Sequence, residues 1–225
     1  MMSINTESVL NEVIDKMQDI LKIRAADIPN IDLYMDQVTT FMDEKLRYTV
    51  RPGESGEKIL TKTMINNYAK NDLLPPPYKK KYSREHMMVL IFVYYFKSFL
   101  TISDIQILLK PLTDTYFGEH EGLELEQIYE SLFDMGEERM QTLEQDLRNR
   151  YEAVTHIFTD VPEDEAKYLR LFTFICFLSY DIFVKKMLIE QLIDELAEKQ
   201  KLQDEEPKKA DERRKDKKRK KENKE

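Results

Sequence analysis

The chain has 225 residues, with 35 Lys and Arg, 43 Asp and Glu, and a net charge of −8. Its 5 Gly and 8 Pro are too few for a turn-rich β-sandwich or a glycine-built phosphate loop. A single cysteine, Cys176, excludes an intrachain disulfide and a multi-cysteine metal site. Residues 1–20 contain four acidic residues and no apolar run, so we expect no signal peptide and a cytoplasmic protein.

The charge is distributed unevenly along the chain. Residues 58–86 contain seven basic and two acidic residues, a net of +5, whereas residues 119–165 contain three basic and fifteen acidic residues, a net of −12. Residues 207–225 contain 11 basic and 5 acidic residues, a net of +6. Segregation of this kind usually separates surfaces that meet different partners, so the negative total does not exclude nucleic-acid binding by one segment.

In chain order, apolar residues at helical spacing predict amphipathic helices over residues 7–24 and 31–47. Residues 48–57 contain Pro and two Gly and are typical of a loop, and a shorter helix is expected over about 60–71. Three consecutive prolines lie in the next segment, 75–82. Because proline cannot occupy a helix interior, we expect this segment to be extended, with a small hairpin as one possibility.

The following segment is strongly apolar. Ser83 is a candidate N-cap of a helix that reaches about Leu100, and residues 87–96 carry no charge. These ten residues are half the length that a bilayer span needs, so we expect a core helix buried on all sides. A short helix is then expected from Ser103 to about Pro111.

Two long helices are predicted in the second half of the chain. Residues 123–158 have apolar residues mainly three and four apart, with one skip at Gly136, which predicts a helix that is kinked or broken there. Pro162 would start the next helix, which extends to about Leu202. Two charged residues in its apolar part argue against a membrane span.

The last helix is rich in aromatic residues, namely Phe172, Phe174, Phe177, Tyr180 and Phe183. We expect these rings to fill a dimer interface or the chain's own core, with an effector cavity as the alternative. Cys176 lies on the same apolar stripe and is expected to be a buried, inert thiol.

The strongest candidate for a functional site lies within residues 60–82. One face of the short helix is apolar, and the other presents side chains that can reach phosphates and base edges: Thr61, Lys62, Thr63, Asn66, Asn67 and Lys70. The later lysines Lys79, Lys80 and Lys81 could neutralise phosphates. A polar-faced helix followed at a fixed distance by a basic loop is what a winged helix-turn-helix requires. A solvated surface helix with a charged loop remains the alternative.

The order of motifs over about residues 58–112 resembles the DNA-binding domain of the mercury-resistance regulator (MerR) superfamily. The strings that carry this resemblance are MINNYAK, DLLPP, KKYS and ISDI. In that superfamily a recognition helix ends in an aromatic pair, and a Gly-Leu-Leu turn leads into the wing. Here Asn66 and Asn67 replace an arginine and the first aromatic residue. Asp72 replaces the turn glycine, which implies a slightly different turn.

Longer strings are similar to a bacterial domain-of-unknown-function family catalogued as eighteen thirty-six. They span about residues 28–112 and are IDLYMDQV, LTKTMINNYAK, LLPPP, KKKYSREH and SDIQILLKPL. Members of that family are regarded as MerR-like transcriptional regulators. The resemblance implies that helix 31–47 is the first helix of a helix-turn-helix, that helix 60–70 enters the major groove, and that 75–82 is the wing.

We therefore expect a mainly α protein with a MerR-like winged helix-turn-helix, a small β wing and long C-terminal helices. Its expected parts are an N-terminal helix (1–27), the DNA-binding domain (28–117), a helical dimerisation or regulatory domain (118–205) and a disordered basic tail (206–225). Its expected function is sequence-specific binding of double-stranded DNA as a transcriptional regulator, in a homodimer formed through 123–202. The predicted DNA-binding residues are Thr61, Lys62, Thr63, Asn66, Asn67, Tyr68, Lys70, Lys79, Lys80, Lys81 and Tyr82.

Two further possibilities stay open at the level of sequence. A small-molecule effector is compatible with such a regulator. A helical protein-interaction adaptor that has lost DNA binding is the alternative function, and the Asn at position 66 favours it. We expect no catalytic residue, metal or cofactor, because His86, His120 and His156 lack ligand spacing and no catalytic motif occurs.

Overall fold

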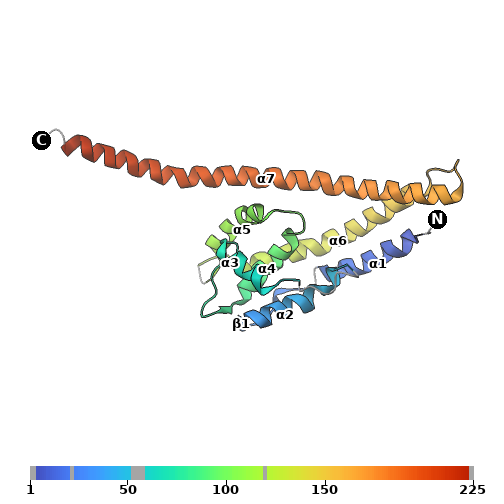
Figure 1. The fold of residues 1–225 in the computed structure, drawn as a ribbon, viewed down its shortest axis with the longest axis horizontal. Coiled ribbons are helices and arrows are strands. Elements are labelled where there is room, and N and C mark those ends of the chain that lie inside the picture. Colours follow the sequence, from blue (N-terminus) through green and yellow to red (C-terminus); the bar gives the residue numbers. More distant parts are fainter. Residues whose placement is uncertain (1–3, 21–22, 52–58, 119–120, 223–225) are drawn as a thin grey trace.

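The computed structural model describes residues 4–20, 23–51, 59–118 and 121–222. Over these residues the chain is mainly helical, as predicted (Figure 1). The elements in order are α1 (Thr6–Ile20), the 3-10 turn η1 (Ala25–Asp27), β1 (Leu33–Tyr34), α2 (Met35–Leu46), the 3-10 turn η2 (Arg47–Thr49), α3 (Lys62–Lys70), β2 (Lys81–Tyr82), α4 (Arg84–Phe96), α5 (Ile102–Tyr116), α6 (Leu125–Thr155) and α7 (Glu163–Glu222). None of the helices in the described part of the chain is long and apolar enough to span a membrane.

The main core is built around α4. Every residue from His86 to Val93 is buried, which confirms the prediction of a helix that is enclosed on all sides. Side chains of α2, α3, α5 and the start of α6 pack against it, together with the buried pair Leu73 and Leu74. This core fixes the position of α3 relative to its neighbours.

The segment predicted to be extended or a small hairpin forms a tight turn and a short strand. Lys81 makes a bridge back to Tyr78, and β2 then pairs with β1 in antiparallel register, Leu33 opposite Tyr82 and Tyr34 opposite Lys81. The turn therefore does not stand alone, because the strand that precedes α2 anchors it.

α6 is continuous over 31 residues, so the predicted break at Gly136 is wrong. A single glycine in a helix costs about 1 kcal/mol relative to alanine, which does not by itself break the helix. Apolar residues of α6 pack against the buried face of α1. This contact joins Leu10, Ile14 and Met17 to Met140, Leu143, Leu147 and Tyr151.

α5 also extends further than predicted, through Pro111 to Tyr116. Proline has no N–H to donate to the carbonyl four residues earlier, which belongs to Ile107. The side chain of Gln200 on α7 donates to that carbonyl instead, at 3.0 Å. A contact between distant parts of the chain thus supplies the hydrogen bond that proline cannot.

α7 runs along one side of the molecule, with the other elements below it in Figure 1. It contacts α6 near its start, where Arg150 and Asp181 form an ion pair at 2.8 Å, and it contacts α5 further along. Its backbone continues as a helix to Glu222, where the sequence predicts disorder from residue 206. Lys, Arg and Glu all have high helix propensity, which favours helix even without an apolar face.

Candidate nucleic-acid interface

α3 is a short amphipathic helix with a defined start. The Thr61 side chain caps it by accepting a hydrogen bond from the backbone N–H of Met64 at 3.2 Å. Ile65 and Tyr68 face the core and are buried. The opposite face consists of exposed polar side chains, namely Lys62, Thr63, Asn66, Asn67 and Lys70. The predicted polar face therefore exists as a solvent-facing surface.

The turn that ends α3 is fixed by a left-handed residue. Asp72 has φ of 54°, and the backbone N–H of Leu73 donates to the carbonyl of Tyr68 at 2.9 Å. This six-to-one bond is the Schellman arrangement, in which glycine is the usual left-handed residue and Asp is tolerated. The sequence suggested a different turn because glycine is absent; the structure has Asp72 in the left-handed conformation instead.

The basic turn has a similarly constrained backbone. Lys79 and Lys80 both have positive φ, at 51° and 64°, as a tight two-residue hairpin turn requires. Both side chains are exposed. Lys81 lies with its ammonium 5.3 Å from the centre of the Tyr34 ring, across the β1–β2 pair. The turn thus presents Lys79 and Lys80 at the tip of a small, anchored ribbon, with the half-buried Lys81 on its strand.

Direct contacts connect the start of α3 to the basic turn. Lys62 forms an ion pair with Asp36 in the first turn of α2. Tyr34 lies two residues before Asp36, and the ammonium of Lys81 lies over its ring. Tyr34, Asp36 and Lys62 are all exposed, so this row of contacts links the start of α3 to the turn along the surface.

Two of the predicted contact residues are in the core instead. Tyr68 is 5% exposed and Tyr82 is 3% exposed, and burial raises the pKa of both phenols. An aromatic residue beside polar ones is ambiguous in sequence, since packing requires the same ring that could stack on a base. The structure places Tyr34 and Tyr78 at the surface instead, and neither was predicted. The surface position of Tyr34 could have been inferred from strand alternation, because its neighbour Leu33 is apolar and points into the core.

His86 holds the base of the turn. Its Nδ1 accepts the backbone N–H of Ser83 at 2.9 Å, and its Nε2 lies 3.2 Å from the carbonyl oxygen of Pro75. The ring is therefore the neutral tautomer with the proton on Nε2, donating to Pro75. Burial lowers the pKa of His86, although the two proline carbonyls act in the opposite direction. The side chain is 4% exposed, so His86 packs in the core beneath the turn.

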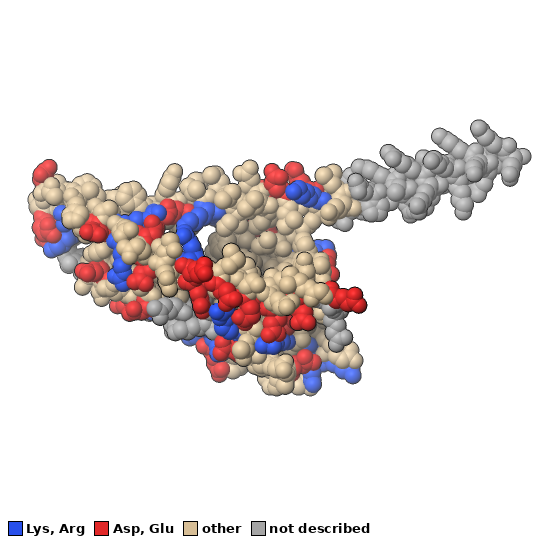
Figure 2. Space-filling model, turned by 180° about the vertical axis from the view of Figure 1, so that it is seen from behind, with Lys and Arg blue, Asp and Glu red and all other residues tan. Residues whose placement is uncertain are grey.

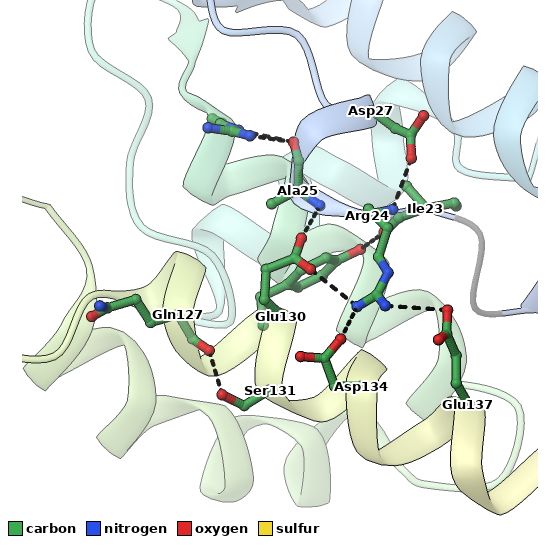
Figure 3. Close-up of polar contacts among 11 residues, drawn as sticks. Ile23, Arg24, Ala25, Asp27, Gln127, Glu130, Ser131, Asp134 and Glu137 are labelled. Atoms are coloured by element: carbon green, nitrogen blue, oxygen red, sulfur yellow. Dashed lines mark hydrogen bonds and ion pairs between the residues drawn. The ribbon is translucent and has the colours of Figure 1, made fainter.

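Residues 23–28, called the strap, lie against the first turns of α6 (Figure 3). The Arg24 guanidinium contacts Glu130 at 3.0 Å, Asp134 at 2.7 Å and Glu137 at 3.1 Å. The buried Tyr129 hydroxyl donates to the carbonyl of Ile23 at 2.6 Å. These contacts fix the first turns of α6 against the strap, whose Ile23, Ala25 and Ile28 belong to the same core as the buried residues of α3.

Acidic and basic side chains are mixed on the face shown in Figure 2, with the acidic ones gathered toward the middle. Among the described residues, no group of three or more His, Cys, Asp or Glu side chains is placed to hold a metal ion. Cys176 is exposed, so the prediction of a buried thiol is wrong.

Comparison with protein families gives a match over residues 23–132, to the family described as "Domain of unknown function (DUF1836)". Neither characterised proteins nor solved structures give a match. The matched segment begins at the strap and ends in α6, and the Tyr129–Ile23 hydrogen bond joins its two ends. The match supports placing residues 23–132 in this domain-of-unknown-function family.

Proposed function

We propose that residues 28–117 form a winged helix-turn-helix that binds double-stranded DNA and regulates transcription. The single observation that carries this proposal is the row of contacts Lys62–Asp36 and Tyr34–Lys81, which links the start of α3 to the basic turn. In this proposal α2 and α3 are the two helices of the unit, and the turn 78–81 is the tip of the wing.

Each part has a distinct task. Asn66 and Asn67 lie in the exposed middle of α3, where a side-chain amide can pair with the edge of adenine in the major groove. Lys79, Lys80 and Lys81 contact phosphates, which sets register and affinity without reading sequence. Such a unit covers few base pairs, so we propose a homodimer on a two-fold symmetric site.

A salt series with the full chain and the DNA upstream of its own gene tests this proposal. Lys80→Glu with Lys81→Glu should weaken binding at least tenfold and reduce the slope of log affinity against log salt by about 2, because two phosphate contacts are lost. The matched control is Lys16→Glu with Arg139→Glu, which changes two exposed charges on α1 and α6 equally. An unchanged slope in the turn variant, or equal loss in the control, would refute the wing assignment.

The adaptor function remains the second candidate, and one contact favours it. Lys62, at the start of α3, is paired with Asp36, which reduces the positive charge available for phosphates. An adaptor predicts that a protein partner co-purifies with the chain. It also predicts that heparin competition leaves no DNA bound, whereas the regulator retains its specific fragment.

A further inference from the structure

One face of α7 is apolar and uncovered. Between Leu171 and Val184 the only charged residue is Asp181, and its carboxylate faces α6, where it pairs with Arg150. Phe174 also faces inward, with its ring 5.7 Å from that of Tyr151. The side of α7 away from α6 carries a row of residues four, four, three and four apart, which we call the outer stripe: Phe172, Cys176, Tyr180, Phe183 and Met187.

The residues of the outer stripe and its flanks are strongly exposed. Five aromatic side chains on α7 are 50% to 68% exposed, namely Tyr168, Phe172, Phe177, Tyr180 and Phe183. In Figure 2 uncharged side chains predominate along the edge that α7 forms. A monomeric protein rarely leaves an apolar patch of this extent in water, so the stripe indicates an interface.

We infer that the outer stripe of α7 is the surface through which two copies of this chain associate. An aromatic side chain carries about 150–250 Å², so five half-exposed rings leave roughly 500 Å² uncovered. Met187 of the stripe and the exposed aliphatic side chains beside it add a comparable area: Ile175, Ile182, Val184 and Leu188. The sum is of the order of the 800 Å² that each partner contributes to a standard interface.

The chemistry of the stripe suits a second copy. Interface cores are depleted of charge and enriched in aromatic residues and Met, which is the composition found here. A straight helical row at steps of three and four can pack against an identical row related by a two-fold axis. The sequence predicts a dimer through 123–202, which includes both long helices. Within that range the apolar row of α6 around Leu143 and Leu147 is covered by α1, which leaves α7 for the contact.

Sedimentation of the full chain over a concentration series tests the inference. The wild type should reach the mass of a dimer, and Phe172→Glu with Phe183→Glu should weaken the dimer at least about 100-fold. Met135→Glu is the matched control, because Met135 is 71% exposed on α6. A wild type that stays monomeric, a stripe variant that stays dimeric, or a control that alone dissociates would overturn the inference.

The wild-type chain offers a second readout that does not depend on the variants folding. Cys176 is the only cysteine, and it is exposed in the single chain. Its rate of reaction with a thiol reagent should fall as the chain concentration passes the dimerisation range. A constant rate across that range would place the interface elsewhere. This inference deepens the proposed function by naming the dimer surface, but both measurements omit DNA, so its failure is distinct from failure of DNA binding.

Discussion

Tyr129 should be a strong determinant of how the first turns of α6 pack against the strap. The side chain is fully buried, its hydroxyl donates to the Ile23 carbonyl at 2.6 Å, and its ring lies 4.4 Å from that of Phe133. Tyr129→Phe keeps the ring contacts and removes only the donor. Leaving a buried carbonyl without this partner costs about 1–3 kcal/mol.

For a chain of this size, 1 kcal/mol corresponds to a fall in Tm of about 2–4 °C. Thermal unfolding followed by circular dichroism should therefore show Tyr129→Phe melting about 2–12 °C below the wild type. Tyr78→Phe removes the same hydroxyl from a side chain that is 71% exposed, and should change stability by less than about 0.5 kcal/mol. Equal melting temperatures for Tyr129→Phe and the wild type would refute the role of this hydrogen bond.

Three further predictions concern single features of the fold. Burial lowers the pKa of His86 below 6.5, so its neutral form contributes stability that is complete above that pH and is lost as pH falls toward the pKa in the folded state. The free energy of unfolding, measured by urea titration, should therefore fall more steeply with decreasing pH below about 6.5 in the wild type than in His86→Gln. Equal slopes of this free energy against pH would contradict the prediction. Asp72→Gly should raise the melting temperature, since glycine removes a left-handed penalty of about 1 kcal/mol; a lower temperature would disprove the turn. Gln200→Leu should lower the free energy of unfolding by about 1–3 kcal/mol. The loss should be much smaller in a Pro111→Ala background, because alanine restores an N–H that can donate to the Ile107 carbonyl. Equal losses in both backgrounds would disprove the cross-helix contact.

The sequence was sufficient where local rules decide the structure. The pattern over about 60–71 predicts α3 closely, and the uncharged run 87–96 predicts the central helix. These features depend on neighbours within one or two turns. The polar face of α3 and the exposed lysines of the turn could be found in the same way.

The remaining features depend on contacts that spacing along the chain does not contain. Pro111 stays inside α5 because of Gln200, 93 positions away from the carbonyl that it contacts. When a helix is apolar on all sides, its sequence does not show which side the rest of the chain packs against. Cys176 was therefore expected to be buried, and the structure has it exposed. Likewise, Tyr82 sits among lysines in sequence, yet strand alternation turns its ring into the core.

The central claim is that the exposed face of α3 reads a DNA sequence. Selection of bound fragments from a random double-stranded library, with the full chain, tests it most directly. We expect the wild type to enrich one motif. We expect Asn66→Ala with Asn67→Ala to lose that motif while keeping the salt dependence of binding, because the phosphate contacts remain. No enriched motif, or the same motif from the variant, would contradict the account.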